Sequence, residues 1–123
     1  MGEDDRQAAA AMGTIYILST ISTSSIEEVA SATPRSRKWF QLYVYKDRNL
    51  SINLIKRAEA AGFEALCLTV DAPYFGKRRL NFRNKFYLSR HERMANFQPG
   101  SGESEGVGAS GDGSAHNKYI DRN

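Results

Sequence analysis

Residues 39–45 read Trp-Phe-Gln-Leu-Tyr-Val-Tyr, and this stretch predicts a buried strand at the centre of the fold. Side chains alternate between the two faces of a strand, so one face is purely apolar while the other carries Gln41, Tyr43 and Tyr45. An amide or a phenol on a buried strand costs free energy unless it has a hydrogen-bond partner. Gln41 and Tyr43 therefore need a polar partner, either inside the protein or in a ligand.

Two further apolar stretches, residues 14–19 and 65–70, are predicted strands that flank the central one in the chain. Helix signals lie between them, and this order predicts parallel strands with right-handed crossovers. Ligands of such sheets bind at the C-terminal ends of the strands. Ser19, Tyr43, Tyr45, Thr69 and Asp71 all fall there, which indicates a shared site.

The two helices between the strands have recognisable starts. A capping-box pattern begins at either Ser24 or Ser25, because each is followed three residues later by a glutamate. Asp47 is the predicted N-cap of a second helix over about residues 48–61, and Gly62 is its predicted stop.

The composition, with 41% hydrophobic and 25% charged residues, is typical of a soluble domain. The apolar runs are far shorter than the roughly 20 residues that cross a bilayer. The acidic start of the chain resembles neither a secretory signal nor a transit peptide. We expect an intracellular protein of the cytoplasm, peroxisome or mitochondrion, with Cys67 as a free thiol and no metal site.

The second half of the chain is less regular. A basic segment runs from Lys77 to Arg93, with aromatic residues between its charges, and the formal net charge of the whole chain is +3. Residues 98–115 are rich in glycine and serine and are expected to form a flexible loop. Residues 116–123 form a tail without an assignment, so the predicted domain covers residues 1–97.

The sequence resembles the FMN-dependent 2-hydroxy-acid oxidases and dehydrogenases, a family that includes glycolate oxidase, lactate oxidase and the flavin domain of flavocytochrome b2. The resemblance spans about residues 8–97. It rests on long motifs without gaps: LST (18–20), SSIEEV (24–29), FQLYVYKDR (40–48), RAE (57–59), AGF (61–63), LTVDAP (68–73), GKRR (76–79), RNKF (83–86) and NF (96–97).

The resemblance implies an α/β fold that is part of a (β/α)8 TIM barrel. A complete barrel takes roughly 250 residues, about twice the length of this chain. The matched motifs correspond to the end of the first helix, the second to fourth barrel strands and the loop that follows. The chain is therefore interpreted as a fragment of such an enzyme.

The resemblance also implies a cofactor, a substrate class and site residues. Ser19, Gln41 and Thr69 would contact the FMN ring. Tyr43 would hydrogen-bond a small 2-hydroxy acid, and Arg78 would hold its carboxylate, a task that suits a guanidinium group. In the family, the hydroxyl proton goes to a histidine and the α-hydrogen goes to the flavin as hydride, giving a 2-keto acid.

The family's catalytic histidine has no counterpart in the matched motifs, so we expect the 123-residue chain to be inactive alone. The full enzyme would be a homo-oligomer. One alternative is a non-catalytic remnant or mispredicted gene fragment. A weaker alternative is a nucleic-acid or anionic-surface patch at Lys77 to Arg93, although we expect no nucleic-acid partner.

Overall fold

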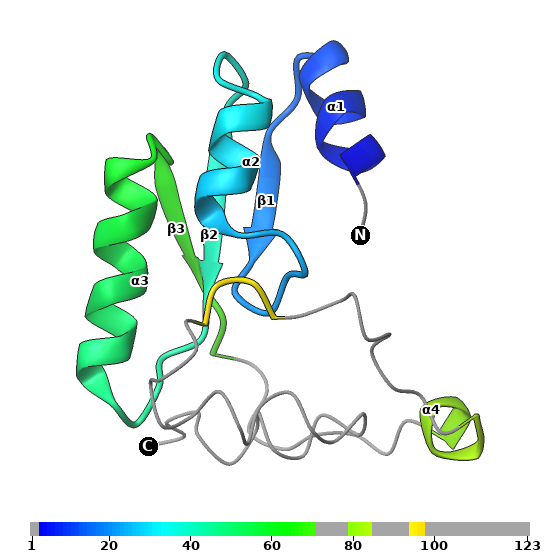
Figure 1. Cartoon of the computed structure of the whole chain (residues 1–123), viewed down its shortest axis with the longest axis vertical. Helices are drawn as coiled ribbons and strands as arrows, with labels where there is room; N and C mark the ends of the chain where they lie inside the picture. The colour runs from blue at the N-terminus through cyan, green and yellow to red at the C-terminus, as the bar shows by residue number, and fades with distance from the viewer. Residues whose placement is uncertain (1–2, 71–78, 85–93, 98–123) are drawn as a thin grey trace.

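The computed structural model describes residues 3–70, 79–84 and 94–97. Helices and strands alternate along this part of the chain, as the sequence predicts (Figure 1). Their bounds are α1 Glu3–Ala11, β1 Tyr16–Ser19, α2 Ile26–Ala32, β2 Lys38–Leu42, α3 Arg48–Ala60, β3 Ala65–Leu68 and α4 Arg79–Arg83.

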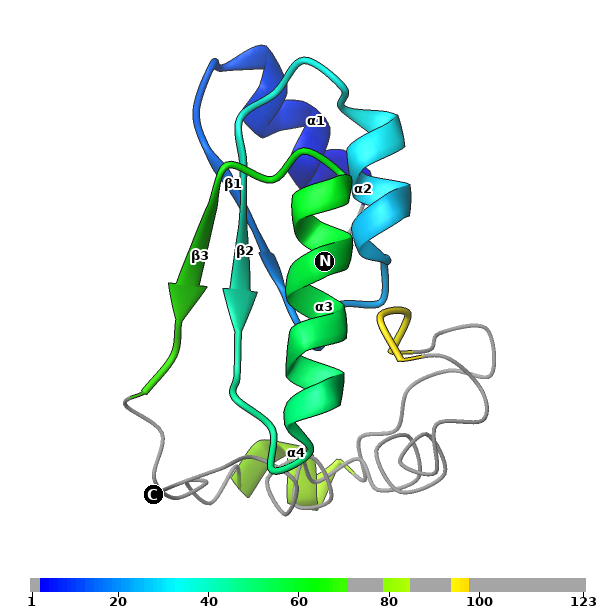
Figure 2. The same cartoon turned by 90° about the vertical axis from the view of Figure 1, so that its left-hand side faces the viewer.

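The three strands form one parallel sheet with β2 in the centre. Figure 2 shows that α2 and α3 lie on the same side of this sheet and that all three strands point to the same end. The predicted parallel α/β fold is confirmed.

Local sequence sets the helix ends. Ser25, and not Ser24, is the N-cap of α2, where its hydroxyl accepts the Glu28 amide and the Glu28 carboxylate accepts the Ser25 amide in return. Asp47 caps α3 by accepting the Asn49 amide at 2.9 Å. Gly62 follows the end of α3 with φ of 78°, a conformation that favours glycine.

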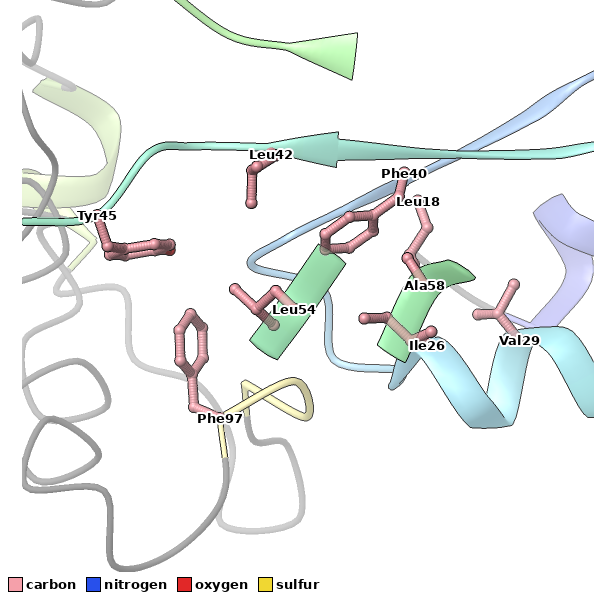
Figure 3. Packing of buried hydrophobic residues seen from close by; sticks show 9 residues of the cluster. All are labelled: Leu18, Ile26, Val29, Phe40, Leu42, Tyr45, Leu54, Ala58 and Phe97. Atoms are coloured by element: carbon pink, nitrogen blue, oxygen red, sulfur yellow. The ribbon is translucent and has the colours of Figure 1, made fainter. Parts of the chain in front are cut away.

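The core lies between the sheet and the two helices. Figure 3 shows Phe40 and Leu42 on β2 facing Leu54 of α3 and Ile26 of α2. Leu18 of β1 joins the same cluster and is fully buried. The apolar face that the sequence predicts for the central strand is thus the face that packs against the helices at Phe40 and Leu42.

The central strand is shorter than predicted, and the face assigned to Tyr45 is wrong. The strand ends at Leu42, and the Tyr45 amide then donates to the Ser51 hydroxyl of α3 at 2.9 Å. This contact turns the chain toward the helix, so the side-chain alternation no longer holds. The Tyr45 ring is buried in the core, edge-on to Phe97 at a centroid separation of 5.8 Å (Figure 3).

The edge strand β3 keeps an apolar face that is only partly covered. Leu66 and Leu68 pair in register with Phe40 and Leu42, so they share the face that packs against the helices. Yet they are 45% and 55% exposed. Among the described residues, β3 pairs only with β2, so its outer edge is open.

Several expectations fall on parts of the chain that the structure does not describe. Arg78, the glycine- and serine-rich segment 98–115 and the tail 116–123 lie outside the described residues, as does most of the basic segment. Within residues 3–70, 79–84 and 94–97, none of the helices has the length and apolar character needed to span a membrane.

Candidate functional site

Three of the predicted site residues form one hydrogen-bonded chain across the sheet. The Ser19 hydroxyl donates to Gln41 Oε1 at 3.2 Å, and Gln41 Nε2 donates to Thr69 Oγ1 at 2.8 Å. The three side chains come from the ends of β1 and β2 and from the residue after β3. Of the predicted strand-end cluster, Ser19 and Thr69 are therefore brought together, with the Gln41 carboxamide between them, while Tyr45 lies in the core and Asp71 lies outside the described residues.

The register of the parallel sheet explains this contact. Ser19 pairs with Gln41 across β1 and β2, so both side chains point to the sheet face away from α2 and α3. Thr20 points the other way and is fully buried, and its hydroxyl donates to the Gln41 backbone carbonyl. The register therefore assigns Ser19, and not Thr20, to the site face.

Two backbone amides reinforce the hydrogen bond between Ser19 and Gln41. Gln41 Oε1 also accepts the Thr20 amide at 3.3 Å, and the Ser19 hydroxyl accepts the Ile21 amide at 3.3 Å. The turn after β1 is therefore tied to the Gln41 side chain. Its geometry fixes which way the Ser19 hydroxyl points.

The chemistry of the three groups suits a planar ligand edge that mixes donors and acceptors. A carboxamide has two N–H donors and one carbonyl acceptor, and a hydroxyl can donate once and accept twice. Ser19, Gln41 and Thr69 are each partly exposed, so the hydrogen-bonding groups that they do not use among themselves are accessible from outside. A flavin ring edge, with one N–H, two carbonyls and a ring nitrogen, matches this set.

Of the two predicted substrate-binding residues, the structure describes Tyr43 and not Arg78. Tyr43 follows β2 by one residue at the same strand end, where it is half-buried and packs against the core cluster. Arg78 lies outside the described residues, so its role stays a prediction. The structure brings together the three predicted ring contacts and leaves the carboxylate contact undescribed.

An ion pair joins helices α2 and α3. Arg57 of α3 makes two contacts of 2.8 Å with the Glu27 carboxylate of α2. The hydrogen bond from Arg57 lowers the pKa of the Glu27 carboxyl, although its burial works in the opposite direction. Arg57 Nη1 also donates to the Asn96 carbonyl at 2.7 Å.

Asn96 is a residue that sequence reasoning missed. It is 1% exposed, and its carboxamide bonds two backbone groups that lie 70 and 76 residues earlier in the chain. The only sequence signal was its place in the Asn96-Phe97 motif, to which no role was assigned. Contacts over such separations cannot be read from local periodicity.

Comparison with known proteins gives a consistent picture. The family model described as FMN-dependent dehydrogenase matches residues 5–122. The chain is 45% identical over 114 residues to 2-hydroxyacid oxidase 1 of Mus musculus, and the matched residues make up 93% of this chain and 31% of the relative. It is 54% identical over 92 residues to glycolate oxidase 3 of Oryza sativa subsp. indica, covering 75% of this chain and 25% of the relative.

Solved structures give the same result. Mandelate oxidase with (S)-2-phenylpropionate superposes with a TM-score of 0.69 at 42% sequence identity, covering 75% of this chain and 27% of that chain. Mandelate oxidase with benzoyl-formic acid gives the same values. The chain spans about a quarter to a third of the length of the relatives it matches.

Proposed function

The chain belongs to the FMN-dependent dehydrogenase family, and we propose that it supplies the flavin-ring contacts of an enzyme that oxidises an L-2-hydroxy acid to a 2-keto acid. The observation that carries this proposal is the Ser19–Gln41–Thr69 chain of hydrogen bonds at the C-terminal ends of three parallel strands. This is the place where ligands bind in parallel α/β sheets.

Each residue would have a defined task. Gln41 would hold the ring edge with its carboxamide nitrogen, because Nε2 has a second N–H for an acceptor of the ligand, while Oε1 already accepts from the Ser19 hydroxyl and the Thr20 amide. Ser19 and Thr69 fix the orientation of that carboxamide from either side. Ser19, Gln41 and Thr69 would hold the ring of FMN, which would supply the hydride acceptor for the oxidation of the hydroxy acid.

Substrate binding would involve the neighbouring residues. The Tyr43 phenol, at the same strand end, would hydrogen-bond the hydroxy acid, and Arg78 would pair with its carboxylate through a two-pronged contact. The names of the relatives point to glycolate and mandelate as test substrates. None of the residues assigned here is a histidine that could accept the hydroxyl proton, so we propose that the 123-residue chain binds ligand without turnover.

The test is a titration of the purified 123-residue chain with FMN, followed by quenching of flavin fluorescence. Gln41→Leu removes the carboxamide with its three hydrogen bonds to Ser19, Thr20 and Thr69. We expect the FMN dissociation constant to rise at least about tenfold, as for the loss of roughly 1.4 kcal/mol. Gln7→Leu, at an exposed position of α1, is the matched control and should leave the dissociation constant unchanged. Equal affinities for the two variants would contradict the proposed contact.

A second measurement addresses turnover. Glycolate and then mandelate are added without oxygen to the FMN-loaded chain, and the visible absorbance of the oxidised flavin is recorded. We expect no bleaching. Bleaching would show that a residue of this chain acts as the base, and His91 would be the first position to mutate.

A further inference from the structure

The described segment 94–97 packs against the turn after β1 and the start of α2 (Figure 1, yellow). Asn96 Nδ2 donates to the Thr20 carbonyl at 3.0 Å, and Asn96 Oδ1 accepts the Ile26 amide at 2.9 Å. One buried carboxamide therefore joins the end of β1 to the first residue of α2. Both of its polar ends have partners, as a buried amide requires.

Other contacts hold the segment itself in place. Arg57 donates to the Asn96 carbonyl, and the Ala95 amide donates to the Ser22 carbonyl at 3.1 Å. On the following residue, the Phe97 ring packs edge-on against Tyr45 (Figure 3). The Asn96 backbone is thus anchored independently of its side chain, so the carboxamide has a fixed direction.

The peptide group between Thr20 and Ile21 is held at both ends. Its carbonyl oxygen, on Thr20, accepts from Asn96, and its N–H, on Ile21, donates to the Ser19 hydroxyl at 3.3 Å. The preceding peptide group is held by β2, because the Thr20 amide lies within hydrogen-bond distance of the Gln41 carbonyl and of Gln41 Oε1. Rotation of the Thr20–Ile21 peptide would withdraw the Ile21 amide from the Ser19 hydroxyl, so that this hydroxyl would no longer be directed at Gln41.

We infer that Asn96 is a positioning residue for the flavin-contact site: through the Thr20 carbonyl it fixes the turn of residues 19–21 and thereby aims the Ser19 hydroxyl at Gln41 and the ring edge. This inference rests on the proposed function for the part that concerns the flavin. For the turn itself it rests on the hydrogen bonds alone. Asn96 acts through Thr20 and Ser19.

The substitution Asn96→Asp separates the two bonds. The remaining oxygen still accepts the Ile26 amide at the start of α2, where a negative charge is favourable. The donor to the Thr20 carbonyl is lost, and two oxygens then face each other. Asn53→Asp, at an exposed position of α3, introduces the same charge change away from the turn and is the matched control.

The first readout needs no cofactor. Amide hydrogen exchange is measured in the full chain at Thr20 and Ile21, with the Tyr16 amide, which donates to the Arg37 carbonyl, as the internal reference. Asn96→Asp should speed exchange at Thr20 and Ile21 about tenfold, the effect of losing about one hydrogen bond, and leave Tyr16 nearly unchanged. Equal acceleration at all three amides, or at none, would overturn the inference.

The second readout is a double-mutant cycle on the FMN dissociation constant with Asn96→Asp and Ser19→Ala. If Asn96 acts through Ser19, Asn96→Asp weakens FMN binding in the wild type but not in the Ser19→Ala background. Effects that simply add would overturn the positioning of the flavin contact. Absence of FMN binding by the wild-type chain would instead refute the proposed function, and hydrogen exchange would still decide whether Asn96 fixes the turn.

Discussion

Gln41 Nε2 donates to Thr69 Oγ1 at 2.8 Å, although the register partner of Gln41 on β3 is Cys67. The carboxamide therefore leans two residues along the neighbouring strand, toward the C-terminal end of the sheet. A long side chain can reach such a diagonal neighbour. This lean carries the polar end of Gln41 to the strand end, where Ser19 and Thr69 lie.

Replacing Thr69 tests the far end of this contact. Thr69→Val keeps the shape of the side chain but removes the oxygen that accepts from Gln41 Nε2. We expect the FMN dissociation constant to rise about tenfold. The carboxamide loses a hydrogen bond between uncharged groups, which contributes about 1 kcal/mol, and its orientation is then no longer fixed. Thr69→Ser restores the hydroxyl and should bind FMN within about twofold of the wild type in the same fluorescence titration. A Val variant that binds as well as the Ser variant would remove Thr69 from the site.

The Glu27–Arg57 pair predicts a pH dependence of stability. The pKa of the Glu27 carboxyl is lowered in the folded protein, so its stabilising contribution is complete above the unfolded pKa of about 4.3 and is lost as the pH falls through the lower folded pKa. Glu27 is 54% exposed, so solvent screens the pair, and Glu27→Gln should cost only about 0.5 kcal/mol at pH 7.

The measurement is urea unfolding of both proteins between pH 7 and pH 3. Their difference in unfolding free energy should be constant near neutrality and should shrink below about pH 4. Glu64→Gln is the control, because it breaks the ion pair between Glu64 and Arg37. Arg37 is more exposed than Arg57, so solvent screens this pair more strongly and its loss should have a smaller effect. A difference that grows as the pH falls would contradict the assigned ion pair.

The role of Gln41 came from the family resemblance, and Ser24 and Ser25 were alternative caps of α2 between which the structure decides. Sequence reasoning identified the parallel order, the Asp47 cap and the strand-end positions of Ser19 and Thr69, because these depend on local signals or on strict alternation. It placed Tyr45 on the wrong face because the Ser51 hydroxyl, six residues later, captures the Tyr45 amide and ends the strand early. It gave no role to Asn96, whose partners lie 70 and 76 residues away. Tertiary contacts of this kind have no periodic signature.

The cap of α3 gives a prediction for stability. Asp47→Ala removes the acceptor of the Asn49 amide, and we expect a loss of about 1 kcal/mol in the free energy of unfolding. Asp47→Asn retains a side-chain oxygen and should lose only a few tenths of that amount. Urea unfolding compares the two variants, and equal losses would show that the charge, not the cap, is what matters.

The open edge of β3 predicts self-association. Leu66 and Leu68 expose apolar surface beside backbone groups that no strand within residues 3–70, 79–84 and 94–97 pairs with, a combination that favours edge-to-edge contact. The double variant Leu66→Lys, Leu68→Lys should lower the average mass seen by light scattering at a given concentration. Ile52→Lys, at a similarly exposed position on α3, should change it little. Equal effects would mean that the added charge, and not the strand edge, controls association.

The most direct test of the central claim places this chain's residues in a complete relative. The matched segment of mouse 2-hydroxyacid oxidase 1 is replaced by the 114 matched residues of this chain, and the FMN content of the purified, folded chimera is measured by absorbance, with and without Gln41→Leu. If Ser19, Gln41 and Thr69 hold the flavin ring, the chimera retains FMN and the Gln41→Leu chimera loses most of it. A folded chimera without FMN, or a Gln41→Leu chimera with an unchanged FMN content, would contradict the account.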